Sequence, residues 1–406
     1  MEEWERWERR VQTAAHPFAY RLLSAAAARG PAVRVPRVGV VVSDARLARE
    51  VLLDTEGYTK TGPGAAAGLW TPVLGQRVLI NMEGAEHAAL RRRLAGLFTP
   101  GHVAAVCERV LRAPLDDLVR RLAAGGEVDL VRVVRDGATD VIRELVGLPD
   151  AGADFAEASA VLSSVRLWRT SLTGRQAARA RAALARLSDA AVTAYRAGDE
   201  STVPGRLRAL GLDEGEARGA VGVLLLTGTE TLVSFVPRLV ALVHDSGRGP
   251  DRITDALIEE ALRVTSPTPV MLRSAARPGR LGGVRVAAGE RVVIATLLCT
   301  RAYGPFAPRV RPGADRGPDP GPGPADLRRL WFGAGPHFCL GMPLAMAEIR
   351  AVAGALRAFP ELRVVDRRPA RGVLVPAYAR LSLRAVQAGR LITRPAPPLR
   401  RPRRPV

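Results

Sequence analysis

The chain has little of several residue types, and each shortage excludes a class of protein. Its 406 residues include only three cysteines, Cys107, Cys299 and Cys339, too few for a disulfide framework and consistent with a reducing compartment. No stretch of about 18 consecutive apolar residues occurs, so the sequence predicts no membrane span. Residues 1–7 are charged and lack the apolar segment of a secretory signal. We therefore expect a cytoplasmic protein without a membrane anchor.

Lysine is almost absent, because Lys60 is the only one and arginine supplies nearly all of the positive charge. The formal net charge of +20 at pH 7 raises the question of nucleic-acid binding. The arginines are spread along the chain, however, without aromatic interleaving or zinc-finger spacing, a distribution that codon bias also produces. Nucleic-acid binding is therefore disfavoured. Only the tail, residues 390–406, concentrates arginine among prolines without acidic partners, and we expect it to be disordered.

Hydrophobic residues make up 47% of the chain, enough for a large core. Three segments show apolar residues at three- and four-residue spacing, which predicts helices: 88–98, 104–123 and 177–197. Short runs typical of β-strands occur at 38–42, 284–286 and 291–297. Residues 309–324 are rich in proline and glycine and predict an irregular loop. With no clear linker, the sequence predicts a mainly α chain with small β-sheets (α+β), one catalytic domain over 1–389 and the tail 390–406.

The most distinctive segment is 332–341, Phe-Gly-Ala-Gly-Pro-His-Phe-Cys-Leu-Gly, which contains Cys339. Its glycines lack a Cβ and so let the backbone approach a large flat group. A helical pattern follows at 342–359, and both a helix N-terminus and a bound metal lower the pKa of a thiol. A single cysteine beside glycines is more often a small buried hydrophobe. The number of fixed positions and three further segments favour the chemical interpretation.

The longest apolar segment, 214–243, carries polar residues in its middle, Thr227-Gly228-Thr229-Glu230-Thr231. A threonine in mid-helix can bond back to a carbonyl one turn earlier and open the backbone ladder, a local widening that often marks a functional site. Helix capping or surface polarity is the simpler alternative for so short a pattern. Pro237 predicts a kink further along.

Two shorter patterns pair charged residues on single helical faces. Glu260 and Arg263 stand three residues apart, and His87 and Arg91 stand four apart, so each pair shares a face. Taken alone, such pairs are usually solvated and contribute little. Arg273 follows a short apolar run that is typical of a strand.

These segments, in this order, resemble the cytochrome P450 family over roughly residues 37–383. The pattern FGxGxHxCxG around Cys339 matches the family's haem loop at every fixed position. The resemblance implies the P450 fold, with haem b between the long central helix and the cysteine loop, and Cys339 as the axial thiolate of the iron. It also implies these haem-contacting residues: His87, Arg91, Arg273, Phe332, Gly333, His337 and Gly341.

Roles in oxygen activation follow from the same resemblance. Gly228 would leave room for dioxygen, Thr231 would hydrogen-bond the bound oxygen, and Glu230 would help deliver protons. The chain departs from the family pattern at Thr227, where alanine or glycine is usual, and at Leu232, where a second threonine is frequent. We therefore expect Thr227 to face the substrate and alter its placement.

The resemblance further implies that Glu260 and Arg263 form a buried structural ion pair against the haem loop. In the family, an arginine of the meander joins this pair. The meander between residues 306 and 332 departs from the family pattern, and Arg309 and Arg316 are both candidates for the third partner.

The function implied is a haem-thiolate monooxygenase that inserts one oxygen atom from O2 into a small, largely hydrophobic organic molecule, a bacterial secondary-metabolite intermediate. A ferredoxin and its reductase would supply electrons, with Arg328 and Arg329 contacting the ferredoxin, and we expect a monomer. Residues expected to line the substrate pocket, several of which could equally be plain core, are Trp70, Val73, Leu224, Thr227, Val270, Met271, Ala377 and Tyr378.

Two alternatives remain open at this point. The first is a peroxide-driven haem-thiolate enzyme, against which the Glu230–Thr231 sequence argues, because such enzymes typically lack that pair. The second is a noncatalytic protein that binds haem or nucleic acid. Haem titration and a salt-dependent DNA-binding assay would separate them.

Overall fold

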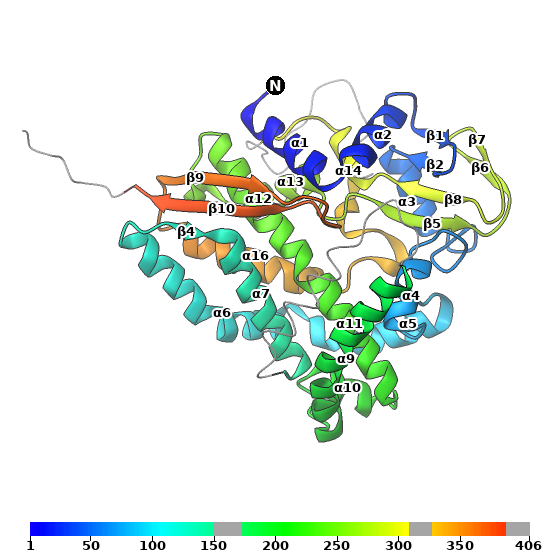
Figure 1. The fold of residues 1–406 in the computed structure, drawn as a ribbon, viewed down its shortest axis with the longest axis horizontal. Helices are drawn as coiled ribbons and strands as arrows, with labels where there is room; N and C mark the ends of the chain where they lie inside the picture. Colours follow the sequence, from blue (N-terminus) through cyan, green and yellow to red (C-terminus); the bar gives the residue numbers. More distant parts are fainter. Residues whose placement is uncertain (149–172, 308–326, 387–406) are drawn as a thin grey trace, which may run out of the picture.

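A computed structural model describes residues 1–148, 173–307 and 327–386. Helices dominate, and Figure 1 shows α12 running through the centre with the sheets towards one side and α6, α7, α9 and α10 towards the other. The principal helices are α1 (Glu3–Ala15), α2 (Pro17–Ala27), α3 (Ala45–Leu53), α4 (Ala67–Leu74), α5 (Gly84–Leu94), α6 (Pro100–Ala123), α7 (Leu130–Val146), α9 (Gly174–Ala197), α10 (Val203–Ala209), α11 (Glu214–Gly228), α12 (Glu230–Asp245), α13 (Asp255–Thr265), α14 (Thr296–Arg301) and α16 (Met342–Leu356).

The strands form three small sheets, which together with the helices confirm the predicted fold class. The largest has the order β1-β2-β8-β5-β3, in which β2 and β8 are parallel and the other neighbours antiparallel. A second has the order β4-β10-β9, and a third pairs β6 with β7. The strands are β1 (Ala32–Val35), β2 (Gly39–Val42), β3 (Tyr58–Thr59), β4 (Val128–Asp129), β5 (Met271–Ala275), β6 (Gly279–Leu281), β7 (Val284–Val286), β8 (Arg291–Ile294), β9 (Leu362–Pro369) and β10 (Tyr378–Ala385).

Several predicted boundaries need correction. The strand expected over 291–297 ends at Ile294, and the next residues form α14. The helix expected over 88–98 is α5 followed by a 3-10 turn, Ala95–Phe98. The helix expected over 342–359 is α16, which ends at Leu356. The expected loop at 309–324 and tail at 390–406 lie outside the described residues.

The long central segment folds as two helices joined at Thr229. Asp213 and Glu216 cap the start of α11 by exchanging side-chain-to-backbone hydrogen bonds. Every residue from Leu232 to Val243 in α12 is buried, and the run is apolar except for Ser234 and Arg238. Pro237 lies inside α12.

We expected no segment long and apolar enough to span a membrane, but by length and composition alone the run Glu214–Asp245 is one. Its most apolar window is 53% buried within the protein, so its apolar faces already have a packing partner. The central core helix of a folded domain meets the same compositional test, and burial accounts for the hydropathy here.

A buried charge network fastens α1 to α12. Arg238, which is fully buried, donates to the Glu8 carboxylate from Nε at 2.8 Å and from Nη2 at 2.5 Å. It also donates to the carbonyl of Thr265 at 2.8 Å. Arg301 of α14 donates to the same carboxylate at 3.1 Å and to the carbonyl of Val264 at 2.7 Å. One carboxylate therefore serves two guanidinium groups, and backbone carbonyls take the remaining donors.

Candidate cofactor site at the cysteine loop

Two 3-10 turns, Leu330–Phe332 and Gly335–His337, shape the loop that precedes α16. Gly333 and Gly335 adopt φ of 84° and 66°, which side-chain-bearing residues rarely adopt. A Cβ on Gly335 would also lie 2.8 Å from the carbonyl oxygen of Leu52. These glycines are therefore required by the turn itself, and their predicted approach to a flat group stays a prediction.

Cys339 stands at the end of this loop, one turn before α16, with its side chain exposed. Its backbone N–H donates to the carbonyl of Phe332 at 2.9 Å, which fixes the loop. Protein atoms crowd the other sides of the thiol, and this burial raises the pKa of Cys339. The backbone N–H groups of Gly341 and Met342 and the charge of Arg91 act in the opposite direction. The thiol thus has a helix N-terminus and a guanidinium ready to stabilise a thiolate.

Basic side chains from four separate segments converge beside this loop. The imidazole rings of His87 on α5 and His337 in the loop have centroids 4.2 Å apart. Burial and then the charge of Lys60 lower the pKa of His87 to about 4 and that of His337 to about 2. Burial lowers the pKa of Arg273 to about 10, and burial followed by the charge of Arg273 lowers that of Lys60 to about 7. The positive charge of Arg91 further lowers the pKa of Lys60 and of both histidines.

Sequence reasoning missed Lys60, although its status as the only lysine was a signal. Thr59 of β3 pairs with Ser274 of β5 in antiparallel register, so the residues beyond them on the two strands, Lys60 and Arg273, are brought side by side. Glu83, at the start of α5, accepts from the backbone N–H of Lys60 at 2.6 Å and from the Thr61 hydroxyl at 2.8 Å. This carboxylate therefore ties the Lys60 segment to the helix that carries His87 and Arg91.

Charge in this region is not balanced by the protein. In the part of the chain that the structure describes, Glu83 is the one acidic side chain whose charge raises the pKa of Lys60, His87 and Arg273. Two arginines and a lysine thus face one carboxylate, and the neutral histidines each retain an N–H to donate. Such a cluster fits a ligand with negative charge at one edge.

The donor set also limits what kind of metal group can bind. Residues 1–148, 173–307 and 327–386 hold no group of three His, Cys, Asp or Glu side chains arranged to bind a metal ion. A single exposed thiol can ligate a metal whose other ligands come from an organic cofactor. Haem needs one axial protein ligand and partners for two propionates, so Cys339 and the basic cluster fit it.

The junction of α11 and α12 has the hydrogen bonds predicted for it. Thr231 Oγ1 donates to the carbonyl of Thr227 at 2.9 Å, and Thr227 Oγ1 donates to the carbonyl of Val223 at 2.8 Å. The helix assignment breaks at Thr229. Thr229 Oγ1 is buried and accepts or donates no hydrogen bond among the described residues. The expected local opening of the helix is therefore confirmed.

Gly228 and Glu230 have structural partners that the sequence did not reveal. A Cβ on Gly228 would lie 2.4 Å from Cδ1 of Ile142, so glycine here lets α11 approach α7. Its predicted role beside dioxygen stays a prediction. Glu230 forms an ion pair with Arg135 of α7. Arg135 lies about 95 residues earlier in the chain, and no local pattern marks it.

Glu260 and Arg263 form the predicted buried ion pair, at 2.7 and 2.8 Å. Arg263 also donates to the carbonyls of Thr300, Gly304 and Pro305 at 2.8 to 3.0 Å, and the N–H of Ala307 donates to Glu260 at 2.8 Å.

Backbone groups thus supply the additional bonds that a buried pair requires. The candidates for a third charged partner, Arg309 and Arg316, lie outside the described residues.

The residues predicted to line a substrate pocket fall into different environments. Met271 Cε lies 3.9 Å from where a Cβ on Gly333 would be, so Met271 is beside the cysteine loop. Trp70 and Val73 belong to α4, and both pack on the same core cluster as Leu224.

The remaining predicted lining residues are further into the structure. Val270 packs on a small separate cluster. Ala377 and Tyr378 are buried, and the Tyr378 ring lies 6.4 Å from that of Trp7, so Tyr378 has the environment of plain core.

Comparison with known proteins agrees with this geometry. No family profile matches the chain. The cytochrome P-450 monooxygenase DoxA of a Streptomyces strain is 31% identical over 82% of this chain and 86% of its own length. Cytochrome P450 165A3 of Amycolatopsis orientalis is 31% identical over 75% of this chain and 76% of its own. The chain belongs to the cytochrome P450 family.

Matches to mycobacterial proteins of the P450 140 group, 28% identical, span 64% of the length of those relatives.

Solved structures show the same fold. A mutant of P450 EryK in complex with erythromycin B has a TM-score of 0.71 and 25% identity, covering 93% of this chain and 98% of its own. CalO2 has a TM-score of 0.74 and 22% identity over the same shares.

Labelling of Lys60 tests the basic cluster directly, because it is the chain's only lysine. The pKa of Lys60 is about 7 without haem. The negatively charged haem propionates would raise this pKa and would also cover the amine from the labelling reagent. Haem should therefore slow acetylation of Lys60 at pH 8 by about tenfold or more, the effect of one pKa unit. Peptide mass spectrometry measures this, and the N-terminal amine is the internal control. Equal labelling of Lys60 with and without haem would show that it does not face the cofactor.

Proposed function

We propose that the protein is a haem-thiolate monooxygenase. It would convert R–H, O2, two electrons and two protons into R–OH and water, with one oxygen atom entering each product. The exposed Cys339 thiol beside an uncompensated basic cluster is the observation that carries this proposal. The name of DoxA, a monooxygenase 31% identical to this chain, supports it.

In the proposed holoenzyme, Cys339 ligates the haem iron, and His87, Arg91, Arg273, His337 and Lys60 hold the propionates. Haem held by a cysteine thiolate supplies the reductive activation of dioxygen, because the thiolate donates electron density that favours O–O cleavage. Binding two carboxylates also relieves the repulsion among Lys60 and the two arginines, so cofactor binding stabilises the fold.

Proton handling is assigned to the junction of α11 and α12. Thr231 Oγ1 already donates its hydrogen to the Thr227 carbonyl, which leaves its lone pairs to accept a second hydrogen bond from the oxygen side. Glu230 forms an ion pair with Arg135 and is only partly exposed. We propose that Glu230 passes protons from solvent towards Thr231, and that breaking the pair with Arg135 precedes each transfer.

A ferredoxin and its reductase are the proposed electron supply. A groove of about 810 Å³ lies between α6 and the start of α16, directly behind the cysteine loop. Arg329, Arg112 and Arg350 line it above an apolar floor that includes Met342 and Met346. Arg329 is half-exposed and pairs with Glu259 at 2.8 Å. Glu108 and Asp116 also line the groove, so its rim is mixed and the three arginines exceed the acids by one. Exposed arginines around an apolar centre support docking of an acidic electron carrier.

The proposed substrate is a small, largely hydrophobic organic molecule, an intermediate of bacterial secondary metabolism. Apolar residues beside the loop and on α11, Met271 and Leu224 among them, support this class. The EryK structure with erythromycin B supports it as well, since that relative shares 25% of its residues with this chain. We propose one catalytic domain over 1–389, acting as a monomer in the cytoplasm.

Replacement of the ligand tests the haem assignment. Cys339→Ala should remove the absorption band that the reduced, CO-bound protein shows for thiolate-ligated haem, because no other exposed cysteine is described. Difference spectra measure the band, and Cys107→Ala, which removes a buried cysteine far from the loop in sequence, should keep it. Survival of the band in Cys339→Ala would refute the ligand assignment.

Loss of the threonine hydroxyl tests the proton route. Thr231→Ala should lower product formation by about 10²-fold, a typical contribution of a positioned proton-transfer group, while electron consumption continues. Product formed per electron pair is the measurement, and Thr231→Ser should restore it because the hydroxyl returns. Unchanged turnover of Thr231→Ala with hydrogen peroxide alone would instead support a peroxide-driven enzyme.

Reduction by ferredoxin tests the docking groove. Replacing Arg328 and Arg329 with alanine should slow reduction of the haem by reduced ferredoxin about tenfold at low salt, because steering by charge is lost. Stopped-flow absorbance follows the reaction. The matched pair Arg277→Ala and Arg363→Ala removes the same charge from exposed positions without ion pairs among the described residues. A similar loss in both pairs would remove the groove as the docking site.

A further inference from the structure

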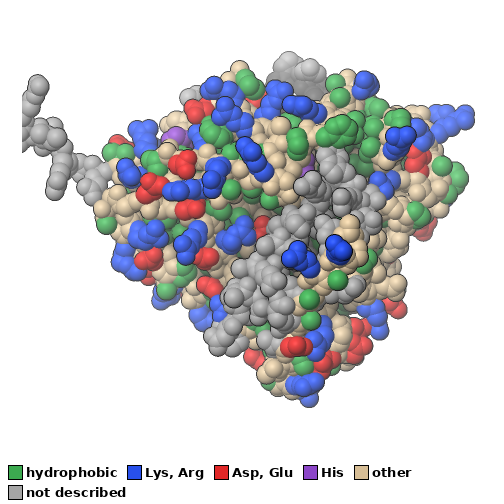
Figure 2. All heavy atoms as spheres, in the orientation of Figure 1, with side chains coloured by type: hydrophobic (Ala, Val, Ile, Leu, Met, Phe, Trp, Pro, Cys, Tyr) green, Lys and Arg blue, Asp and Glu red, His purple; other side chains and the backbone are tan. Residues whose placement is uncertain are grey.

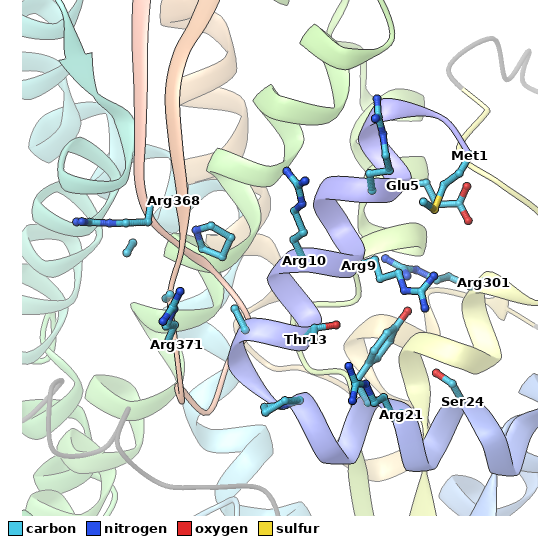
Figure 3. A pocket seen from close by; sticks show the side chains of 17 residues that line it. Met1, Glu5, Arg9, Arg10, Thr13, Arg21, Ser24, Arg301, Arg368 and Arg371 are labelled. Atoms are coloured by element: carbon cyan, nitrogen blue, oxygen red, sulfur yellow. The ribbon is translucent and has the colours of Figure 1, made fainter.

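A second, larger groove of about 1520 Å³ lies between the N-terminal helices and the β9–β10 turn. Figure 3 shows the lining side chains on α1, α2 and the β9–β10 turn, with that of Arg368 directed away from α1. Thr13, Tyr20 and Ser24 contribute hydroxyl groups. Its lining includes seven arginines: Arg6, Arg9, Arg10, Arg21, Arg301, Arg368 and Arg371. In Figure 2, arginines are frequent on the face that includes α1 and β9.

Most of these arginines have no acidic partner within the described part of the chain. Arg367, one residue before Arg368, pairs with Asp245 at 2.7 Å and with Glu3 at 3.2 Å. By contrast, six lining arginines are exposed and form no ion pair within the described part of the chain: Arg6, Arg9, Arg10, Arg21, Arg368 and Arg371. Among the described residues that line the groove, Glu5 is the single acidic one.

The floor of the groove adds positive charge of its own. Arg301 lines the groove and belongs to the buried network in which Arg238 and Arg301 share the Glu8 carboxylate. Two guanidinium groups against one carboxylate leave one buried positive charge unbalanced. In Figure 3 Arg301 lies beside Arg9 and Arg21, and water screens its charge poorly because its side chain is mostly buried.

The fold holds these arginines in fixed relative positions. Residues at helical spacing on α1, Trp4, Glu8, Val11 and Ala15, are buried, which turns Arg6, Arg9 and Arg10 outwards along one face. The β9–β10 turn is tied to the helices by the N–H of Gly372, which donates to the carbonyl of Ala14 at 3.1 Å, and by a bond of 2.9 Å between His16 Nε2 and the carbonyl of Leu374. Repulsion among these arginines is therefore maintained by tertiary packing.

We propose that this groove docks an acidic segment of a partner protein. The groove exceeds the 300 to 1,000 Å³ typical of small-molecule pockets, and seven arginines are among its lining residues, whereas such pockets carry only a few polar groups. Tyr20 is its only aromatic lining residue, so it lacks the stacking platforms of single-strand nucleic-acid sites. Glu5 would repel a continuous phosphate backbone, but an acidic protein segment can place a neutral or basic residue there.

The groove is separate from the proposed electron-donor site. It shares no lining residue with the groove behind the cysteine loop. Binding there would leave the face around Arg329 open, so a partner could be held while electrons are delivered. This inference does not depend on the monooxygenase assignment, because it rests on charge and shape alone.

A charge-matched pair of triple variants tests the inference. The groove variant carries Arg9→Gln, Arg21→Gln and Arg371→Gln, all at exposed positions that make no ion pair among the described residues. The control carries Arg46→Gln, Arg277→Gln and Arg363→Gln, which are likewise exposed and without such a pair. Both lose the same charge, and both keep the basic tail. Haem absorbance and circular dichroism confirm that each full-length, haem-loaded variant is folded.

The probe is a fluorescein-labelled poly-glutamate peptide, with binding followed by anisotropy at about 0.15 M salt. We expect the groove variant to bind it about tenfold more weakly than the unmodified protein and the control to bind it almost unchanged. An equal loss in the control would overturn the inference, because net charge alone would then explain binding. Tighter binding of an oligo-thymidine of equal charge, weakened by the groove variant, would overturn the assignment to an acidic protein segment.

Discussion

Arg91, Arg273 and Lys60 converge on a region where Glu83 is the one opposing carboxylate among the described residues. The cluster also joins three elements. Glu83 bonds the Lys60 segment to α5, and pairing of β3 with β5 places that segment beside Arg273. Repulsion within this cluster is a cost of folding that a dianionic cofactor removes. We therefore expect the region around this cluster to be the least stable part of the apoprotein. Haem binding would then raise the free energy of unfolding of the whole protein.

Buried arginines elsewhere are stabilised by a different means. Arg263 and Arg238 each combine one carboxylate with several backbone carbonyls. Backbone carbonyls can accept these hydrogen bonds without any further charged residue. The guanidinium of Arg263, which pairs with Glu260, therefore also fixes the chain near Thr300 and Pro305. The chain from Thr300 to Ala307 is thus fixed by bonds to the side chains of Arg263 and Glu260.

Local patterns in the sequence were enough to identify the cysteine loop, the Glu260–Arg263 pair and the threonine bonds at the α11–α12 junction. Each depends on residues a few positions apart. The contacts of Lys60 and the pairing of Arg135 with Glu230 were missed because they join segments that only tertiary packing brings together. The contacts of Gly228 with Ile142 and of Tyr378 with Trp7 were missed for the same reason. The packing of a neighbouring helix decides them, and residue spacing within one segment does not reveal it.

The near-exclusive use of arginine has a consequence for how the surface can be regulated. Guanidinium groups keep their proton throughout the pH range in which proteins are folded, whereas a lysine-rich surface begins to discharge in mild alkali. With one lysine, which lies in the candidate cofactor site, the exterior of this protein has almost no cation that titrates in mild alkali. From neutral pH into mild alkali, its long-range attraction for acidic surfaces is therefore nearly constant, and ionic strength is the solution variable that weakens the attraction there.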